Sequence, residues 1–465
     1  MDTTKKTVLG FACLMAFASS AFAHASNQAF VPLLPTGFYT AAGVAAVAVT
    51  VLLLAIPNIA KLFSTNATIT LFDTKGYDGH IYTSLLSALF WVFLVIVGFH
   101  GSHDPLVNPL PLFVWTVWWV AFVTLSAVIG NFWHWLNPWS GLYALVVGSA
   151  NYKPPLTLPV SLGSWPAIII FIAFAIFMLA SISPEDPEEL AYFVSLYLAF
   201  TFLGMVLFGK NEWYGRAECF TMIIRYFSAL SIVGIHDNKV KIGLPRWKLQ
   251  TQQKQTTTAG LFVLTVFAVS SFDGLNETFW WLDFLDINPL EFPGRSTIFW
   301  ETTAGILITP LILISLFCGC VYSGLAMIGE TKRFKEAFFV LAIAIVPIAV
   351  GYHLAHYLAS FLVNIQYSLA AATDPWTTGA DFLNLGTFYV TTGFFNTLES
   401  SRIIFLTQVT AVVTGHILSI IVAHAAAYSL FKNNKLATIS QIPLATFMIA
   451  YTLFGLWLLA APRGV

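Results

Sequence analysis

Two histidines, His353 and His356, lie one helical turn apart in an apolar stretch that is long enough to cross a bilayer, within the run 351–357 (Gly-Tyr-His-Leu-Ala-His-Tyr). A second apolar stretch carries His416 and His424. Ionisable side chains at that depth are costly unless they pair, bind an ion or cofactor, or line a water path. The pattern therefore indicates buried chemistry of three kinds: coordination of a metal or haem, a proton path, or hydrogen bonds between helices.

Helix geometry gives the depth of each histidine. His353 and His356 lie ~4.5 Å apart along their helix axis, on adjoining faces. On the next predicted helix, which runs the opposite way, His416 falls at a similar depth in the outer half. Three imidazoles can therefore converge, and we predict a site for zinc or copper, with haem as the alternative. His424 is also a candidate metal ligand but lies ~12 Å deeper, in another layer.

Two carboxylates near the predicted outer surface, Asp273 and Glu301, are candidates for general acid–base catalysis. A carboxylate behind a metal-bound histidine fixes the orientation of the imidazole ring. Either side chain can also serve as the base for a metal-activated water. The structural alternative is that they cap helices. We name both as candidate catalytic residues.

A second histidine group is predicted outside the membrane. His100 and His103 lie in the loop 99–105, on the same side as His24, the predicted first residue of the mature chain. A free amine together with the His24 imidazole can chelate copper(II), and nitrogen ligands suit copper, zinc or iron. These three residues are candidate metal ligands, although exposed histidines are also common in such loops.

The composition places all of these residues in a membrane protein. Hydrophobic residues make up 58% of the chain and charged residues only 9%, with a mean hydropathy of +0.79. Soluble globular proteins have roughly a quarter charged residues. The fold class predicted is therefore all-α, a polytopic bundle of transmembrane helices in contact with the lipid bilayer.

The N-terminus has the three parts of a secretory signal peptide over residues 1–23: two lysines, an apolar run, and small residues before the predicted cleavage site. Residues 24–465 then form a single transmembrane domain. Its apolar stretches match the ~20 residues that a bilayer core requires. The ten predicted spans are 36–56, 84–99, 112–131, 166–182, 190–208, 257–272, 300–326, 338–363, 403–430 and 443–461.

The distribution of basic residues predicts the orientation, because Lys and Arg accumulate on the cytoplasmic side. With the mature N-terminus outside, the inside loops hold 16 Lys and Arg, and the outside segments hold three. This arrangement predicts a multi-pass protein of a bacterial inner membrane with a periplasmic mature N-terminus.

The longest inside loop, 209–256, is basic. Its segment 216–235 mixes apolar and charged residues, which predicts an amphipathic helix at the interface, followed by a basic stretch against anionic headgroups. The alternative for this loop is a docking surface for a cytoplasmic partner subunit.

Soluble-enzyme signatures are missing from the sequence: there is no Walker loop, dinucleotide fingerprint, Gly-x-Ser-x-Gly elbow or His-Glu-x-x-His motif. No feature points to nucleic acid. A catalytic site in this chain must be assembled from side chains on different helices.

Several blocks resemble a family of bacterial integral membrane proteins that carry the name fenitrothion hydrolase. The similarity extends from about residue 84 to 430. It implies hydrolysis of an organophosphorus ester. The matching blocks are Trp-Thr-Val-Trp-Trp-Val at 115–120, Gly-Asn-Phe-Trp-His-Trp-Leu-Asn-Pro-Trp at 130–139, Ser-Ser-Phe-Asp-Gly at 270–274, Ala-His-Tyr at 355–357, Gly-His at 415–416 and Ala-His at 423–424.

Three functions are compatible with these residues. The first is a metal-dependent hydrolase, or its membrane subunit, acting on an apolar ester that enters from the bilayer, because bound metal activates water near neutral pH. The second is a redox subunit that holds haem or copper. The third is a metal transporter or assembly factor in which the histidines form a relay.

Overall fold

The computed structural model describes most of the chain, and the predicted signal peptide, with Cys13 and His24, lies outside the described residues. The described ranges are 31–56, 68–73, 79–148, 152–236, 239–245, 247–249, 256–291, 294–386 and 388–463.

The all-helical architecture is confirmed. Nine helical segments in the described part are long and apolar enough to cross a membrane. The stretch predicted at 166–182 forms a shorter apolar helix, α10 (Trp165–Ala180). The long segments are α3 (Thr36–Leu54), α5 (His80–His100), α6 to α7 (Pro109–Val128), α11 (Pro187–Phe208), α14 (Thr257–Asn276), α16 with its leading turn (Arg295–Met327), α17 with α18 (Thr331–Thr373), α19 (Leu398–Phe431) and α21 (Ile442–Ala460).

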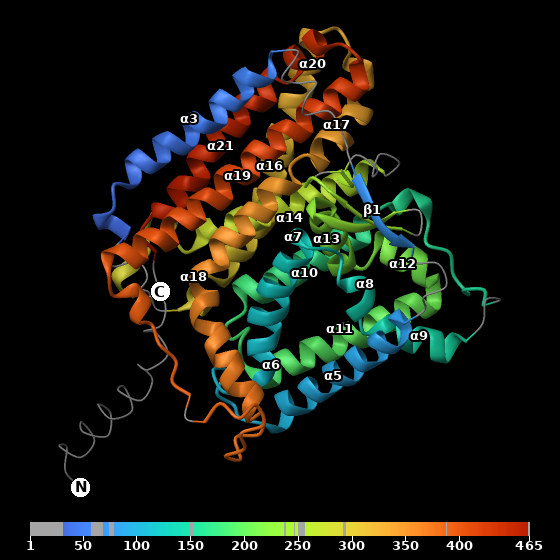
Figure 1. The fold of residues 1–465 in the computed structure, drawn as a ribbon, viewed down its shortest axis with the longest axis vertical. Coiled ribbons are helices and arrows are strands. Elements are labelled where there is room, and N and C mark those ends of the chain that lie inside the picture. Colours follow the sequence, from blue (N-terminus) through green and yellow to red (C-terminus); the bar gives the residue numbers. More distant parts are fainter. Residues whose placement is uncertain are drawn as a thin grey trace.

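The helix α18 (Val346–Thr373) forms the centre of the bundle. It packs along α19 on one side and along η2 (Leu112–Phe122), an 11-residue π-helical segment, on the other. Figure 1 shows α3, α19 and α21 together on one flank of the molecule and α5 with α11 on the other flank. Residues of α18 therefore contact both halves of the structure.

One membrane-spanning segment is broken within the bundle. α17 (Phe334–Ile343) ends at Ala344, and α18 starts at Val346 with Pro347 in its first turn. Proline cannot donate a backbone hydrogen bond, which permits a break at this point. The carbonyl of Ala344 accepts a hydrogen bond from Ser419 of α19. A freed backbone group inside the bundle is thus satisfied by a neighbouring helix, as a membrane interior requires.

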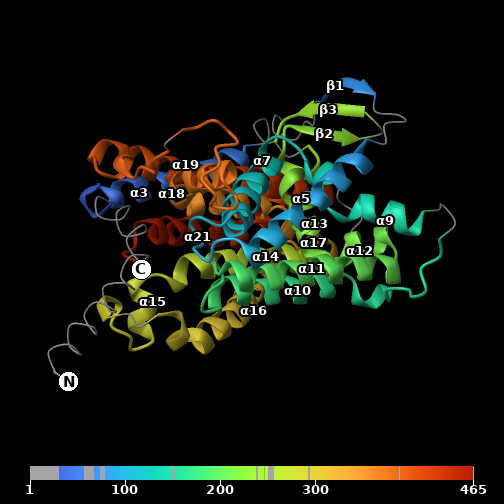
Figure 2. The same ribbon diagram turned by 90° about the horizontal axis from the view of Figure 1, so that it is seen from below.

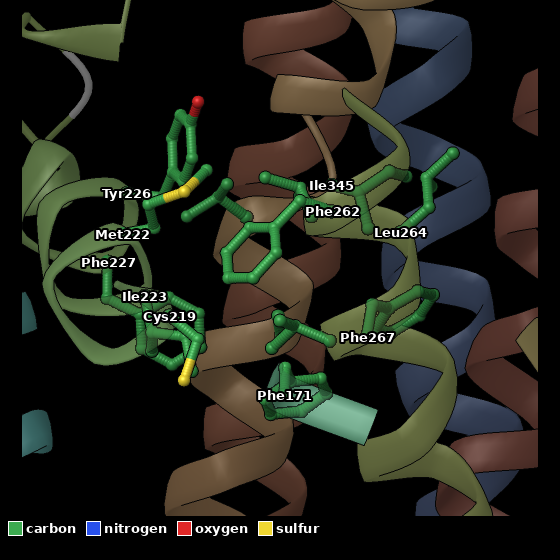
Figure 3. Packing of buried hydrophobic residues seen from close by; sticks show 14 of the residues in the cluster. Phe171, Cys219, Met222, Ile223, Tyr226, Phe227, Phe262, Leu264, Phe267 and Ile345 are labelled. Atoms are coloured by element: carbon green, nitrogen blue, oxygen red, sulfur yellow. The ribbon is translucent and has the colours of Figure 1, made fainter. Parts of the chain in front are cut away.

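The segment predicted to lie at the interface is instead buried. α13 (Cys219–Phe227) begins at Glu218, whose carboxylate accepts from the backbone amides of Phe220 and Thr221. Its Met222 and other apolar side chains belong to the main core, and Figure 3 shows them in one packed layer with Phe262 of α14. Seven of the nine residues of α13 are buried, so no large apolar face is left for lipid.

A small antiparallel sheet was not predicted. Its strand order is β1 (Thr68–Asp73), β3 (Lys239–Gly243) and β2 (Val233–His236). Two loops that are predicted to lie on the same side of the membrane thus pair through backbone hydrogen bonds. Figure 2 shows the three strands beside one another at one edge of the molecule, beyond the helices. α12 (Lys210–Arg216) lies in the same loop region as β2 and β3. The remaining short helices are α8 (Trp133–Leu136), α9 (Trp139–Val147), α15 (Phe279–Phe284) and α20 (Asn434–Ser440).

Candidate functional site

A carboxylate, an imidazole and a phenol meet inside the bundle. Asp273 of α14 and His356 of α18 form an ion pair, with 3.2 Å between the carboxylate Oδ2 and the imidazole Nε2. The hydroxyl of Tyr357 donates to the same Oδ2 atom at 2.7 Å. Only 6% of the Asp273 side chain and 10% of the His356 side chain are exposed. A buried carboxylate is stable only with such partners.

The other histidine of the pair lies one turn earlier, on the aromatic side of α18. The His353 ring is 5.1 Å from the ring of Tyr357 and 5.4 Å from that of Trp119 in η2, both edge-to-face. Phe227 of α13 contacts it from a third direction, at 6.2 Å. Its Nε2 atom is buried without a hydrogen-bond partner among the described residues. His353 therefore has an open ring nitrogen in an otherwise aromatic environment.

The opposite side of His356 is closely packed. A Cβ atom added to Gly274 would lie 3.9 Å from the Nδ1 atom of His356 and 3.7 Å from Tyr352. Within the described structure, Nδ1 of His356 and the hydroxyl of Tyr352 have no hydrogen-bond partner. The small residue on α14 thus leaves room for no more than about a methyl group beside the free imidazole nitrogen.

An ion pair lies close to this cluster, on the side of the bundle that is predicted to face outward. Arg463, which follows α21, lies 3.4 Å from the carboxylate of Glu277, which follows α14. Asp273 lies one turn before Glu277 on α14. The buried carboxylate is therefore about one helical turn, ~6 Å, from charged groups at the end of the helix.

His416 does not join the pair on α18, contrary to the depth inferred from the sequence. Its Nδ1 atom is 2.9 Å from the carbonyl of Val412, and its Nε2 atom is buried without a described partner. The preceding Gly415 packs against Pro347, six residues before His353. His416 thus lies roughly 9 Å below His353 along the bundle.

His424 belongs to a third layer, as expected from its position in the sequence. Its Nε2 atom is 3.2 Å from the side-chain oxygen of Asn434 in α20. Gln441 donates to the carbonyl of Ala423, beside it. These contacts place His424 at the end of α19 opposite to Asp273.

The remaining predicted site residues lie apart from this cluster. Glu301 is exposed in the first turn of α16. His100 and His103 are exposed at the end of α5 and in the loop that follows it. The structure thus brings together Asp273 and His356, with His353 one turn away, and leaves these three side chains separate.

The donor groups do not fit a metal centre with three protein ligands. The described residues contain no group of three or more His, Cys, Asp or Glu side chains arranged to hold one ion. Haem ligation by two imidazoles needs a facing pair, and His353 and His416 occupy different layers. The Asp273 and His356 contact does match the carboxylate and histidine arrangement found behind metal ligands. A second donor for an ion at Nδ1 of His356 is missing from the described residues.

Sequence reasoning missed Tyr357 and Trp119 as parts of the site. Tyr357 directly follows His356, and adjacent helical residues differ by about 100° around the axis, so both can reach one carboxylate. Trp119 lies in the block 115–120, which the sequence marked only through its resemblance to a family. The π-helical turn of η2 had no signal in the sequence, although such turns are frequent at functional sites.

The fold and the buried polar groups define the chain as a polytopic, all-helical membrane protein. No family model, curated protein or solved structure matches it. The function is therefore inferred from the protein's own side chains.

Proposed function

We propose that this protein is a proton-coupled membrane transporter in which the buried Asp273, His356 and Tyr357 carry protons whose movement across the membrane is coupled to that of the transported solute. The observation that supports the proposal is the carboxylate oxygen shared by an imidazole and a phenol inside membrane-spanning helices. Ionisable residues at such depth, facing the bundle interior, are typical of proton relays.

The packing around the cluster favours proton transfer over binding of a large molecule. A proton moves between groups in hydrogen-bond contact, and Asp273 contacts two such groups. The free nitrogens of His356, His353 and His416 lie at successive depths. Histidine exchanges protons near neutral pH when it is accessible to water or to another titratable group. These residues form the outer and middle parts of a relay.

The broken segment supports transport. α17 and α18 are interrupted at Ala344–Ile345, at the depth of His416, whose neighbour Gly415 packs against Pro347. Substrate and ion sites of transporters are commonly formed at discontinuous helices near the middle of the bilayer. We place the solute at this break, with zinc or copper ions as the first candidates, because imidazole nitrogen suits both metals.

A metal-assisted or general-base hydrolase is the second candidate function. It is favoured by the free Nδ1 atom of His356, whose opposite nitrogen is held by Asp273. A carboxylate likewise orients the catalytic histidine of serine hydrolases, although it holds Nδ1 there and Nε2 here. The resemblance to the fenitrothion hydrolase family implies the same reaction class, with an apolar organophosphorus ester as substrate.

The two functions are separated by an assay in proteoliposomes that contain a pH-sensitive dye. For transport, addition of Zn²⁺ or Cu²⁺ outside should produce proton movement and metal uptake together, and Asp273→Asn should reduce both at least tenfold. Cys318→Ser, in α16 and distant from the cluster, should behave as the wild type. Absence of proton movement and of metal uptake in the wild type would refute the transport proposal for these ions. Turnover of a phosphotriester without any gradient, lost in His356→Ala, would establish the second function instead.

A further inference from the structure

A cavity of about 50 Å³ lies between α5, η2, α9, α10, α11 and α13, on the far side of Trp119 from the histidines. A buried water needs only ~10–15 Å³ of such space, together with polar partners. The accessible lining of this cavity is wholly apolar. Water is therefore a poor occupant. Its main lining rings are those of Trp91, Trp115, Trp118, Trp139, Phe174 and Phe193.

The aromatic frame keeps this cavity open. The indole N–H of Trp115 donates to the carbonyl of Pro184, and that of Trp139 donates to the carbonyl of Leu198. The Trp118 ring packs edge-to-face on Phe220 at 4.7 Å. Rings that are fixed by hydrogen bonds and by edge-to-face contacts cannot rotate freely into the empty space. The cavity is thus a preformed feature of the fold.

The cavity is reached from the hydrocarbon region. Its wall includes one face of α11, a membrane-spanning helix, where Leu190 and Val194 are buried and Phe193 and Leu198 are partly exposed. Leu196, on another face of α11, is 70% exposed. An apolar molecule dissolved in the bilayer therefore meets the edge of the cavity without crossing a polar layer.

We infer that this cavity binds a single hydrocarbon chain, either a lipid acyl chain or an isoprenoid chain, which inserts from the bilayer beside Phe193 and Leu198 of α11. The absence of polar lining means that the head group remains outside. Trp119 separates the chain from His353, because it contacts Trp118 at 6.3 Å on one side and the imidazole at 5.4 Å on the other. The site goes beyond the proposed transport function and does not depend on it.

Photochemical labelling in proteoliposomes tests the inference. The full-length protein is reconstituted with one of two probes, a phosphatidylcholine with a diazirine in the acyl chain or a diazirine-bearing isoprenoid alcohol. Labelled peptides are then identified by mass spectrometry. Labels on the cavity side chains of α11, Leu190 and Val194, are expected with at least one probe, and the probe that labels them identifies the type of chain.

The matched variants are Val194→Trp, which fills the cavity, and Leu196→Trp, which adds the same ring on the exposed face of α11. Val194→Trp should reduce labelling at Leu190 at least tenfold, and Leu196→Trp should leave it unchanged. If Val194→Trp does not fold, Val114→Phe fills the same cavity from η2 and should have the same effect.

Two results would overturn the inference: labelling with neither probe, or equal labelling at Leu190 in the filled and control variants. Proton movement is measured on the same proteoliposomes. Failure of transport with labelling intact would refute the proposed function alone, and the reverse would refute only the chain site.

Discussion

Replacing Gly351 by alanine tests the contact that holds the two histidine-bearing helices together. A Cβ atom at Gly351 of α18 would lie 2.5 Å from the carbonyl oxygen of Ala411 in α19 and 3.2 Å from its carbonyl carbon. A Cβ atom at Gly415 of α19 would likewise lie too close to the carbonyl oxygen of Pro347 in α18. Carbon atoms in good contact are ~3.5–4.0 Å apart. The helices must therefore separate by several tenths of an ångström or more.

The expected loss in the free energy of unfolding follows from packing, and a matched variant separates it from the effect of replacing glycine by alanine in a helix. Overfilling a packed contact costs about 1–3 kcal/mol, whereas alanine in place of glycine inside a helix gains about 1 kcal/mol. Gly319 of α16 has open space around its added Cβ and receives only the gain. Gly351→Ala should thus have a free energy of unfolding about 1–3 kcal/mol lower than that of Gly319→Ala.

Unfolding in mixed micelles with an increasing fraction of SDS, followed by tryptophan fluorescence, measures this difference. Equal unfolding free energies for the two variants would show that α18 and α19 separate without cost, and would refute the close contact. In the transport assay, Gly351→Ala should also slow proton movement, because the separation shifts His416 relative to the break between α17 and α18.

Three further predictions concern other parts of the chain. Tyr357→Phe removes a hydrogen-bond donor to the buried carboxylate of Asp273 and should lower the free energy of unfolding by about 1.5–3 kcal/mol. The same substitution at the exposed Tyr389 is the neutral control, and equal stability of the two variants would contradict the hydrogen bond. Burial lowers the pKa of Lys248 from 10.5 to about 8. Between these pH values the unfolded chain therefore holds a proton on Lys248 that the folded protein lacks, so the free energy of unfolding should rise with pH across that window. The pKa is measured by NMR of the methylated lysines, in which the Lys248 signal is the one lost in Lys248→Arg. Titration of that signal near 10.5 would contradict the prediction. In a Cys13→Ser background, a membrane-permeant thiol reagent should modify Cys318 and Cys320 of α16, which are partly exposed, and should modify Cys219 only after SDS is added. Modification of all three thiols in the folded protein would show that α13 is not buried.

The membrane spans were predictable because each depends on a local property. An apolar stretch of about 20 residues has few alternatives in a bilayer, since every backbone group must be satisfied within the helix. The stretch at 166–182 differs from the others: α10 forms there, but it is shorter than the nine segments of the described part that are long enough to cross a membrane. The boundaries differed mainly where helices extend beyond the predicted apolar core, as α18 does on continuing to Thr373, past the predicted end at 363.

The burial of α13 was not predictable from its composition. Arg225 and Glu218 indicated a surface helix, but the structure uses both side chains locally: Glu218 caps α13, and Arg225 donates to the carbonyl of Gly215. Charges that are satisfied by nearby backbone groups do not require solvent. The amphipathic pattern was correct, and the partner of the apolar face was protein instead of lipid.

The loop after α18 contains two successive turns of the same kind, which were not predicted from the sequence. Asp374 accepts from the amides four and five residues later, and Asp381 does the same in the next turn. Both turns contain residues with positive φ at equivalent places, Thr377 and Asn384, each followed two residues later by a glycine with positive φ. The repeat D-x-x-x-x-G is visible in the sequence once this geometry is known, but as a pattern it is too short to predict the fold.

The depth of His416 was misplaced because it depends on how α18 and α19 are aligned. The predicted spans, 338–363 and 403–430, place His353 and His416 at similar distances from their outer ends. In the structure, α18 continues to Thr373, and the glycine contacts align Gly415 with Pro347 in the first turn of α18. Only contacts between the two helices reveal this alignment.

The Asp273 cluster shows why residue types alone do not define a relay. One oxygen of Asp273 contacts both His356 and Tyr357. If a proton moves from His356 to this carboxylate, its charge is lost and the hydrogen bond from Tyr357 weakens, because bonds to ionised acceptors are roughly twice as strong as neutral ones. The phenol is then free to turn toward the neighbouring His353 ring, 5.1 Å away. The protonation of one residue therefore changes the partner of the next, which is the property that a proton relay requires.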